Sequence, residues 1–473
     1  MDSKEIQLVV VGAGPGGYAA AFYAADQGKR VILVEKDPQL GGVCLNRGCI
    51  PSKALLHATE LIHEAEISAQ RGISFGEPRI ELDKLRDWKK GILTKLSQGI
   101  AFLAQKRGVE VITGRGYFED SHTLRVETSA GQQFIKFEQA LIATGSSSFK
   151  PRSLDLGNPR IMTSRQALDV EEIPDELLVI GGGYIGMELG FVYSGLGSQV
   201  TVIEALDSIL AGADADLAKP VAENAKKRFK EIRTGAKVAS MATADSRIKV
   251  VSKLADGTQL EELYDRVLIA VGRRPNSENL GIENTKAEIN DQGFIEVDSR
   301  QRTADPNIYA IGDVVGGAML AHKAHKEGRV AVENILGEDA EFQDAAIPAV
   351  VFTDPEVAWC GLTEAEAKEQ GRKVEISKFP WAASGRSLTY DRTDGLTKLI
   401  IEPETERILG VGMVGHGAGE LIAEAALAIE MGATAFDLAE TVHPHPTLSE
   451  TIMEAAEAYY GSATHVLGKG RKK

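Results

Sequence analysis

Two cysteines lie close together near the N-terminus, in the segment GGVCLNRGCIPSK that runs from Gly41 to Lys53. Cys49 stands at the start of an expected helix with Pro51 in its first turn, so the helix dipole would stabilise a thiolate there. Lys53 lies one turn further on and adds positive charge on roughly the same face. The spacing predicts a redox-active Cys44–Cys49 pair, and the alternative is two free thiols in a turn.

A second candidate for chemistry is the segment His443-Pro444-His445-Pro446-Thr447, in which two prolines stiffen the backbone around two imidazoles. A nearby imidazole could act as general base in a thiol–disulfide reaction, because only the thiolate attacks. Glu450 follows on a helix, where it shares an acidic stripe with Glu454 and Glu457. Periodicity alone favours a solvated charge at Glu450, and the functional alternative is a carboxylate that fixes the tautomer of an imidazole.

The elements that would position these groups include a repeated unit of strand, glycine-rich turn, helix and second strand. The first copy contains Leu8–Val11, Gly12, Gly14, Gly17 and Glu35, and the second contains Leu177–Ile180, Gly181, Gly183, Gly186 and Glu204. In both copies the acid follows the first glycine by 23 residues. Such glycines allow a tight turn, close approach of a pyrophosphate and close packing of the helix, and the acid accepts hydrogen bonds from a ribose. The repeat predicts two dinucleotide-binding domains, and the alternative is two glycine-rich turns without a ligand.

Glu204 also bears on the choice of nicotinamide cofactor. A 2′-phosphate ~4 Å from this carboxylate would be repelled by about 4 kcal/mol per charge pair at an effective dielectric constant of ~20. No Arg or Lys lies between Ala205 and Ala218 to reverse the sign of the interaction. The sequence therefore predicts NAD rather than NADP.

Further strands and helices complete an α/β chain with a C-terminal α+β part. The segments expected as strands are Ala140–Gly145, Val267–Gly272, Asn307–Asp313, Gly395–Ile401 and Ile408–Val414, and those expected as helices are Ala321–Leu336, Glu420–Met431 and Leu448–Tyr460. We expect two Rossmann-like dinucleotide-binding domains and a C-terminal α+β domain. The expected boundaries are 1–146 for the first part of the first dinucleotide-binding domain, 147–273 for the second dinucleotide-binding domain, 274–346 for the second part of the first or central domain, and 347–473 for the C-terminal domain.

Length, charge and cysteine content agree with this organisation. The chain has 473 residues, which at about 150 residues per domain indicates about three domains. Its net charge of −15 argues against nucleic acid or an anionic membrane as a partner. Three cysteines cannot form the disulfide framework of a small secreted protein. No signal peptide is visible and glycines interrupt the uncharged stretch 7–25, so we expect a cytoplasmic protein without a membrane span.

Over almost its whole length the chain resembles the flavin- and pyridine-nucleotide-dependent disulfide oxidoreductases, and within them the members that oxidise dihydrolipoyl groups. The segments that carry the resemblance are VGAGPGGY (11–18), GGVCLNRGCIPSKALLH (41–57), GGGYIGMELG (181–190), VGRRPN (271–276), YAIGDV (309–314), MLAHKA (319–324), PWAASGR (380–386) and HPTLSE (445–450). The most specific of these is the segment with the two cysteines. The chain departs from the family at Pro444, where a small residue is common.

The resemblance implies FAD in the first nucleotide site and NAD in the second. It therefore makes 1–146 and 274–346 the two parts of an FAD-binding domain, 147–273 an NAD-binding domain and 347–473 an interface (dimerisation) domain. It implies that Cys49 is the thiol beside the flavin and that Cys44 exchanges with the substrate. His445 would be the acid–base group, oriented by Glu450, and both would come from the other subunit of a homodimer. The implied FAD-binding residues are Gly12, Gly14, Gly17, Glu35, Lys53, Thr144, Gly145, Asp313 and Ala321, and the implied NAD-binding residues are Gly181, Gly183, Gly186, Glu188, Glu204 and Gly272. Lys53 and Glu188 would form an ion pair beside the flavin.

The implied reaction is the oxidation of protein-bound dihydrolipoyl groups to lipoyl with reduction of NAD⁺ to NADH. The implied partner is a lipoyl-bearing acyltransferase or a lipoyl carrier protein, in a 2-oxo acid dehydrogenase complex or in glycine cleavage, and we expect no metal. A glutathione-type reductase would need cations near Glu204, and a mercuric reductase would carry a further C-terminal cysteine pair, whereas no cysteine follows Cys360. A non-catalytic structural flavoprotein is the remaining alternative, against which the intact Cys44, Cys49 and His445 argue.

Overall fold

The computed structural model describes residues 3–343 and 346–467. The first sheet has seven strands in the order β3-β2-β1-β6-β5-β4, with β17 pairing with β6. These strands are β1 (Ser3–Val11), β2 (Val31–Glu35), β3 (Glu110–Thr113), β4 (Arg115–Asp120), β5 (Thr123–Thr128), β6 (Gly131–Ile142) and β17 (Ile308–Ala310). β1 runs parallel to β2 and β6. Residues Leu8 to Val11 are buried, as expected for a strand covered on both faces.

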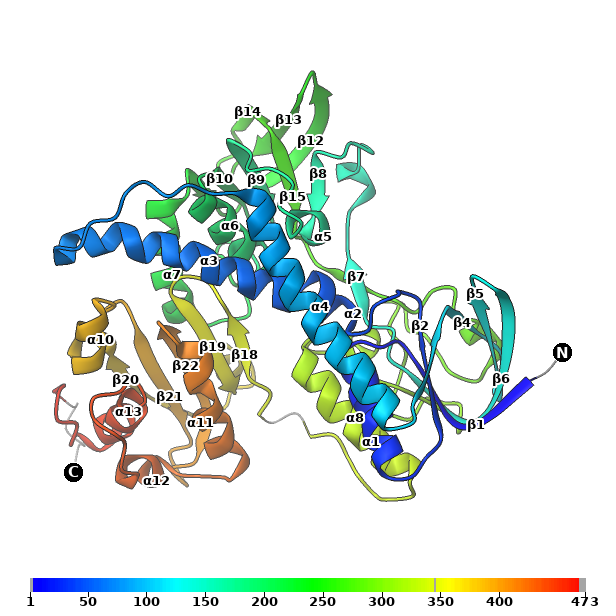
Figure 1. Cartoon of the computed structure of the whole chain (residues 1–473). Helices are drawn as coiled ribbons and strands as arrows, with labels where there is room; N and C mark the ends of the chain where they lie inside the picture. Colours follow the sequence, from blue (N-terminus) through cyan, green and yellow to red (C-terminus); the bar gives the residue numbers. More distant parts are fainter. Residues whose placement is uncertain (1–2, 344–345, 468–473) are drawn as a thin grey trace.

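Helices α1 (Pro15–Asp26) and α8 (Ala321–Ile335) pack side by side on one face of this sheet (Figure 1). Leu8 and Val10 point into the core that these helices cover, whereas Val9 and Val11 point into a second core on the opposite face. α1 begins at Pro15, immediately after Gly14, so its N-terminus lies directly at the glycine-rich turn.

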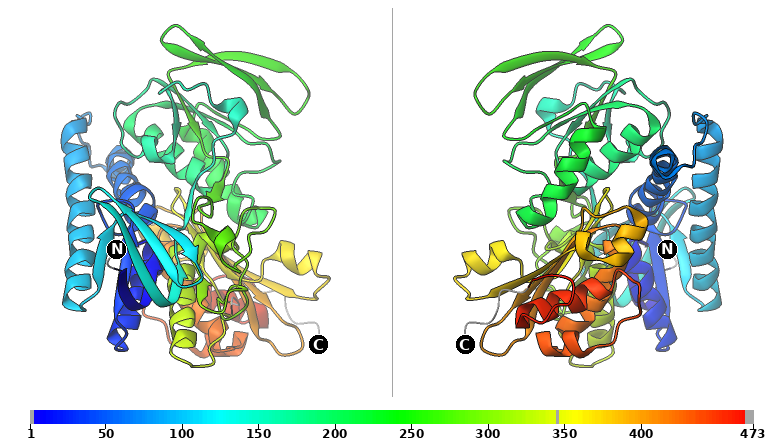
Figure 2. Two further views of the ribbon diagram at one scale, coloured as in Figure 1. Left: turned by 90° about the vertical axis from the view of Figure 1, so that its right-hand side faces the viewer. Right: turned by 90° about the vertical axis from the view of Figure 1, so that its left-hand side faces the viewer.

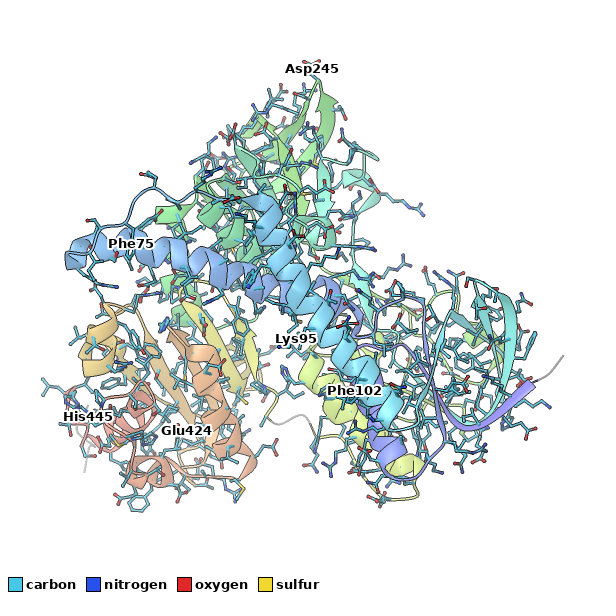
Figure 3. The ribbon with its side chains drawn as sticks, viewed as in Figure 1. Phe75, Lys95, Phe102, Asp245, Glu424 and His445 are labelled. Carbon is cyan, nitrogen blue, oxygen red and sulfur yellow. The ribbon has the colours of Figure 1, made fainter. Side chains whose placement is uncertain are left out.

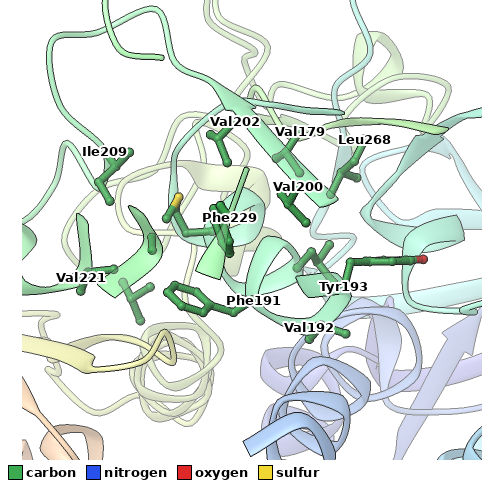
Figure 4. Close-up of a cluster of buried hydrophobic side chains, with 14 of the residues drawn as sticks. Val179, Phe191, Val192, Tyr193, Val200, Val202, Ile209, Val221, Phe229 and Leu268 are labelled. Atoms are coloured by element: carbon green, nitrogen blue, oxygen red, sulfur yellow. The ribbon is translucent and has the colours of Figure 1, made fainter. Parts of the chain in front are cut away.

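The second nucleotide-binding region has five parallel strands in the order β11-β10-β9-β15-β8. The strands are β8 (Ile161–Thr163), β9 (Glu176–Ile180), β10 (Gln199–Ile203), β11 (Glu231–Arg233) and β15 (Arg266–Ile269), and the helices are α5 (Ser164–Ala167), α6 (Tyr184–Leu196) and α7 (Ala215–Arg228). Figure 4 shows the core between α6 and the sheet, in which the rings of Phe191 and Phe229 lie 4.9 Å apart between centroids.

An antiparallel sheet of β12 (Lys237–Ala244), β13 (Arg247–Lys253) and β14 (Gln259–Tyr264) extends from this region. Figure 2 shows that this sheet and the C-terminal helices lie at opposite ends of the molecule.

The chain enters and leaves the second region through β7 (Ser146–Ser148) and β16 (Arg273–Pro275), which pair with each other. The two crossings therefore lie side by side.

Three helices lie between β2 and β3 of the first sheet in the sequence. They are α2 (Gly42–Arg47), α3 (Cys49–Ile67) and α4 (Leu82–Lys106), with a 3₁₀ turn η1 (Ser68–Arg71) after α3. Further 3₁₀ turns are η2 (Arg152–Leu154), η3 (Ile282–Asn284), η4 (Gly312–Val315) and η5 (Trp381–Ala383). Within the described residues, no helix is both long enough and apolar enough to span a bilayer.

The C-terminal part is an antiparallel five-stranded sheet in the order β18-β19-β22-β21-β20. Its strands are β18 (Ala349–Val351), β19 (Glu356–Gly361), β20 (Glu375–Pro380), β21 (Leu396–Ile401) and β22 (Ile408–Gly415), and its helices are α9 (Glu364–Glu369), α10 (Gly385–Tyr390), α11 (Ala418–Glu430), α12 (Ala435–Glu440) and α13 (Glu450–Tyr460). The predicted fold class, two parallel nucleotide-binding sheets plus an α+β part, is confirmed. The four domain boundaries stay a prediction.

Candidate active site

The two glycine-rich turns share one geometry. Gly12 has φ +105°, and a Cβ there would come within 2.3 Å of the carbonyl oxygen of Ala143. At Gly14, by contrast, a Cβ would meet no described atom within 4 Å. The backbone N–H of Ala13 donates to Glu35 Oε2 over 2.8 Å, so the acid at the end of β2 holds the turn.

The second turn repeats these features. Gly181 has φ +107°, and a Cβ at Gly183 would also meet no described atom within 4 Å. The N–H of Gly182 donates to Glu204 Oε2 over 2.6 Å, and the N–H of Leu206 donates to Oε1 over 2.7 Å. Both acids thus lie beside the turn that would hold a pyrophosphate, while their ribose contacts stay a prediction.

A cavity of about 1110 Å³ extends from the N-terminus of α1 past the two cysteines to the start of α6. Twelve of the predicted residues line it: Gly12, Gly14, Gly17, Glu35, Cys44, Cys49, Lys53, Thr144, Gly145, Glu188, Asp313 and Ala321. Its described lining does not include the other predicted residues, namely Gly181, Gly183, Gly186, Glu204, Gly272, His445 and Glu450. The structure therefore brings the predicted FAD-binding residues and both thiols into one space.

The two thiols are free and hydrogen-bonded to each other at the junction of α2 and α3. Cys49 is the first residue of α3. The hydrogen bond from Cys44, together with the positive charge of Lys53, lowers the pKa of Cys49 from the usual 9.0 to about 7. The same hydrogen bond and burial raise the pKa of Cys44. The geometry thus favours a thiolate at Cys49 and a protonated thiol at Cys44.

Lys53 and Glu188 form an ion pair that joins α3 to α6. Lys53 Nζ lies 2.9 and 2.8 Å from the two carboxylate oxygens of Glu188, and Ser52 Oγ donates to Oε2 over 2.8 Å. The N–H of Phe352, from the C-terminal part, donates to Oε1 over 3.1 Å, and the Phe352 ring centre lies 4.4 Å from Lys53 Nζ. The Glu188 side chain is 4% exposed, so all three parts of the chain meet at a buried carboxylate.

Asp313 lies in η4 on the cavity wall, and a buried ion pair in α8 supports its turn. Glu327 Oε2 accepts a hydrogen bond from the N–H of Gly312 over 2.7 Å, and Lys323 Nζ donates to the carbonyl of Gly316 over 3.0 Å. Lys323 and Glu327 also pair with each other. α8 begins at Ala321, so its N-terminus lies on the same wall.

His445 and Glu450 form a second hydrogen-bonded pair. His445 Nδ1 lies 2.9 Å from Glu450 Oε1, and the N–H of Thr447 donates to Oε2 over 2.7 Å. Burial acts to raise the pKa of Glu450, but these hydrogen bonds outweigh it and hold the pKa below its usual range. Glu450 is therefore not the freely solvated charge that its helical periodicity favoured, but a carboxylate bonded to an imidazole.

Within one chain the imidazole and the thiols are not brought together. His445 lies at the outer edge of the C-terminal part (Figure 3), whereas α2 lies near the centre of the molecule in the same view (Figure 1). The His445 side chain is 74% exposed. An exposed imidazole held in one orientation is able to serve a second molecule.

Several residues around the cavity were not singled out from the sequence. Tyr184 is 43% exposed and lies on the cavity wall at the start of α6. Arg273 donates to Ser146 Oγ over 2.7 Å and lies 3.7 Å from Asp313. Tyr184 and Arg273 belong to the recognisable segments GGGYIG and VGRRPN, which is a signal that could have identified them. Phe352 has no such signal, because its contact depends on how the C-terminal part packs.

Comparison with known proteins identifies two family models in the chain. Pyridine nucleotide-disulphide oxidoreductase matches residues 6–328, and the dimerisation domain of the same oxidoreductases matches residues 347–456. Dihydrolipoyl dehydrogenase of Vibrio parahaemolyticus is 45% identical over 469 residues, covering 99% of this chain and 98% of the relative. Dihydrolipoyl dehydrogenase of Haemophilus influenzae is 46% identical over 465 residues, covering 98% and 97%.

Solved structures agree over the same length. LpdA from Mycobacterium tuberculosis superimposes with a TM-score of 0.88 at 29% identity, covering 96% of this chain and 100% of that chain. The HOCl-induced flavoprotein disulfide reductase RclA from Escherichia coli superimposes with a TM-score of 0.86 at 28% identity, covering 97% and 99%.

Proposed function

Because the chain belongs to the pyridine nucleotide-disulphide oxidoreductase family, we propose that it is an enzyme that oxidises dihydrolipoyl groups to lipoyl and reduces NAD⁺ to NADH. The enzyme uses FAD and NAD. One observation carries the proposal: Cys44 and Cys49 lie on the wall of a nucleotide-sized cavity, with Cys49 at the N-terminus of α3 beside Lys53. The relatives named dihydrolipoyl dehydrogenase cover nearly the whole chain, which favours this reaction over the glutathione-type and mercuric reductases.

The groups that line the cavity suit the binding of FAD in the first nucleotide site. The open side of Gly14 and the N-terminus of α1 suit a pyrophosphate, and Glu35 lies beside the turn. Asp313 and Ala321, the first residue of α8, line the same cavity as the two thiols. FAD bound there supplies the two-electron carrier between the cysteine pair and NAD⁺.

In the proposed reaction the oxidised enzyme carries a Cys44–Cys49 disulfide. His445 takes the proton from one substrate thiol, and the resulting thiolate attacks the sulfur of Cys44 while Cys49 leaves as a thiolate. The second substrate thiol then attacks the substrate sulfur of the mixed disulfide, which closes the lipoyl ring and releases Cys44, and Cys44 takes up a proton. The dithiol left behind has the protonation pattern favoured by the free pair, with Cys44 as donor and Cys49 as thiolate.

The chain contains the family's dimerisation domain, and the enzyme is a homodimer. We propose that His445 and Glu450 of one subunit serve the thiols of the other. The exposed imidazole and its separation from α2 within one chain support this arrangement.

The substrate in the cell is proposed to be a lipoyl-bearing acyltransferase or lipoyl carrier protein, of a 2-oxo acid dehydrogenase complex or of glycine cleavage. We also propose a cytoplasmic location, because a reversible dithiol and an otherwise isolated Cys360 suit a reducing compartment. Cell fractionation followed by pull-down with lipoylated domains tests both statements.

The test of the reaction is steady-state turnover of dihydrolipoamide with NAD⁺ by the FAD-loaded protein. Cys44→Ser and Cys49→Ser are expected to abolish turnover while leaving FAD bound. Cys360→Ala is the matched control, because Cys360 is buried in the C-terminal core and its pKa is raised by burial to about 11. Full activity of Cys49→Ser, or a wild-type preference for glutathione disulfide and NADPH, would contradict the proposal.

A further inference from the structure

The loop between α12 and α13, residues 441–449 and here called the base loop, carries one buried and one exposed histidine. The side chain of His443 is 4% exposed, whereas that of His445 is 74% exposed. Pro444 lies between them and has a fixed φ, which stiffens the link. A shift of the buried histidine would therefore be passed on to the exposed one.

The base loop is attached to the fold at both of its ends. At the C-terminal end the N–H of Thr447 donates to Glu450, and at the N-terminal end the hydroxyl of Thr441 donates to a carbonyl of α12 over 2.7 Å. Between these points, no backbone N–H of residues 442–446 donates to a backbone carbonyl of the described part of the chain. The hydrogen bonds that hold the stretch before the exposed imidazole therefore come from the side chain of His443.

Both ring nitrogens of His443 have an oxygen partner. Nδ1 lies 2.8 Å from the carbonyl oxygen of Thr441, and Nε2 lies 2.7 Å from Glu424 Oε1. Because a carbonyl can only accept, Nδ1 carries a proton, and a second proton lies between Nε2 and the carboxyl group. Glu424 belongs to α11 (Figure 3), so this imidazole joins the base loop to a different helix.

We propose that His443 is a positioning residue for the acid–base group His445, because its bond to Glu424 ties the base loop to α11. This inference rests on the proposed function, since His445 is the acid–base group only in that reaction. His443 cannot itself take the proton of a substrate thiol, because it is buried and both of its nitrogens are already hydrogen-bonded.

The imidazole of His445 is thus held from two sides. Glu450 bonds to its Nδ1 over 2.9 Å and sets the orientation of the ring, while the bond between His443 and Glu424 holds the backbone that precedes it. A general base must lie within hydrogen-bonding distance of the proton that it takes, and a displacement of about 1 Å can cost about 100-fold in rate. Loss of one of the two attachments should therefore lower the rate without abolishing it.

The experiment compares two substitutions of Glu424 in the FAD-loaded enzyme. Glu424→Met removes the hydrogen-bond partner with little change in size, whereas Glu424→Gln keeps an amide that can bond to Nε2 of His443 as donor or as acceptor. We expect kcat/KM for dihydrolipoamide to fall by about tenfold in Glu424→Met and to stay within about twofold of the wild type in Glu424→Gln. Glu430→Met, at an exposed glutamate of the same helix, is the control.

A second reaction shows whether only the thiol step is affected. Oxidation of NADH with ferricyanide as acceptor should be unchanged in Glu424→Met, because ferricyanide takes electrons from the reduced flavin and no substrate thiol has to lose a proton. An equal loss in this reaction would overturn the inference, since the substitution would then damage the enzyme as a whole.

A double-mutant cycle separates positioning from a structural role. In the His445→Gln enzyme, adding Glu424→Met should change the residual kcat/KM by less than about twofold, because the group to be positioned is already absent. A further tenfold loss in that background would overturn the inference. Dissociation of Glu424→Met into monomers, measured by light scattering, would overturn it as well, since the loss would then come from the dimer.

The remaining outcomes concern the hydrogen bond itself. Full activity of Glu424→Met overturns the inference, and so does an equal loss in Glu424→Gln, because the bond would then not be what holds the loop. If the wild-type enzyme does not oxidise dihydrolipoamide, the proposed function fails. Hydrogen exchange still tests the attachment in that case: amides of the base loop should exchange faster in Glu424→Met than in the wild type, and unchanged exchange would contradict the attachment.

Discussion

The reactivity of Cys49 depends on a small set of neighbouring residues. Cys44 donates a hydrogen bond to its sulfur, and Lys53 adds a positive charge one helical turn away. Glu188 acts against this lowering of the pKa by its own negative charge, but it also holds Lys53 in place over 2.8 Å. The thiolate at Cys49 is therefore controlled by an ion pair that joins two domains.

Lys53→Met is expected to raise the pKa of Cys49 from about 7 towards the ordinary value of a thiol, 9.0. The lowered pKa means that the thiolate dominates above about pH 7 in the wild-type protein. Without the cation the thiolate should form only at higher pH, since the charge of Glu188 is then no longer opposed by that of Lys53. Thiolate absorbance of the reduced protein as a function of pH measures the midpoint.

Lys90→Met, at an exposed position of α4, is the control for the loss of one positive charge. An unchanged midpoint in Lys53→Met would show that the hydrogen bond from Cys44 alone determines the pKa of Cys49.

Single-residue chemistry could be predicted where the partners are neighbours in sequence. Cys49 and Lys53 share one turn of α3, so the helix dipole and the nearby charge follow from the spacing. The bond between Glu188 and the N–H of Phe352 could not be predicted, because it joins α6 to a turn of the C-terminal part. Helical periodicity misjudged Glu450 for a related reason, since the loop at Thr447 folds over it and donates to it.

At the scale of single elements, the glycine-rich turn before α1 determines how this helix packs and what it can bind. A Cβ at Gly17 would come within 1.9 Å of the carbonyl oxygen of Gly12. A Cβ at Gly14 would instead point into the cavity, where no described atom lies within 4 Å. The two glycines therefore serve different purposes: Gly17 allows the helix to pack on the turn, and Gly14 leaves room for a ligand.

Gly17→Ala is expected to destabilise the protein by about 3 kcal/mol or more, because backbone must move to relieve the clash. Gly14→Ala should unfold like the wild-type protein, since its φ of −71° suits alanine, but it should bind FAD more weakly. Urea unfolding and the flavin content of the purified variants measure the two effects. Equal stability of Gly17→Ala and the wild type, or full FAD content in Gly14→Ala, would contradict this assignment.

Elements with strong local signals were predicted within a few residues of their observed bounds. α8 was expected at Ala321–Leu336 and spans Ala321–Ile335, and β21 was expected at Gly395–Ile401 and spans Leu396–Ile401. α4 was not predicted, because it contains Gly91 and Gly99 and leaves Trp88 and Phe102 exposed, so its apolar pattern does not mark one buried face.

At the scale of the whole molecule, a buried ion cluster joins the second nucleotide-binding region to the C-terminal sheet. Lys398 of β21 is completely buried, and its Nζ lies 2.6 Å from Asp214 Oδ2, 2.8 Å from Asp216 Oδ1 and 2.9 Å from Glu364 Oε1. Asp214 immediately precedes α7 and also accepts hydrogen bonds from the first N–H groups of α9. One ammonium group is therefore the shared cationic partner of three carboxylates contributed by both regions.

Lys398→Met is expected to lower the free energy of unfolding by about 3–5 kcal/mol, because it leaves buried carboxylates without their cation. The loss should be larger at pH 8 than at pH 5, since protonation of the carboxylates relieves the repulsion at low pH. Lys378→Met is the matched control: Lys378 contacts Asp216 and Glu364 but is 40% exposed, so its loss should cost less than about 1 kcal/mol. Equal effects of the two substitutions would contradict the view that burial makes this cluster important.

The part of the architecture that could be predicted from the sequence is the part encoded by its internal repeat. Two copies of strand, glycine turn, helix and acid predict two nucleotide-binding sheets, and both are present. The distance between His445 and the thiols could not be predicted from the sequence, because it depends on where the C-terminal part docks. The proposed catalytic site combines a base on one side of the molecule with a dithiol at its centre, and it therefore requires a second subunit.

The central claim is that the Cys44–Cys49 pair lies against FAD and exchanges electrons with it. The most direct measurement is the visible spectrum of the purified protein during anaerobic titration with NADH. The account predicts a yellow protein that develops a long-wavelength absorption band from the Cys49 thiolate beside the flavin, and predicts that Cys49→Ser lacks this band. A colourless protein that does not take up FAD, or an identical band in Cys49→Ser, would contradict the account.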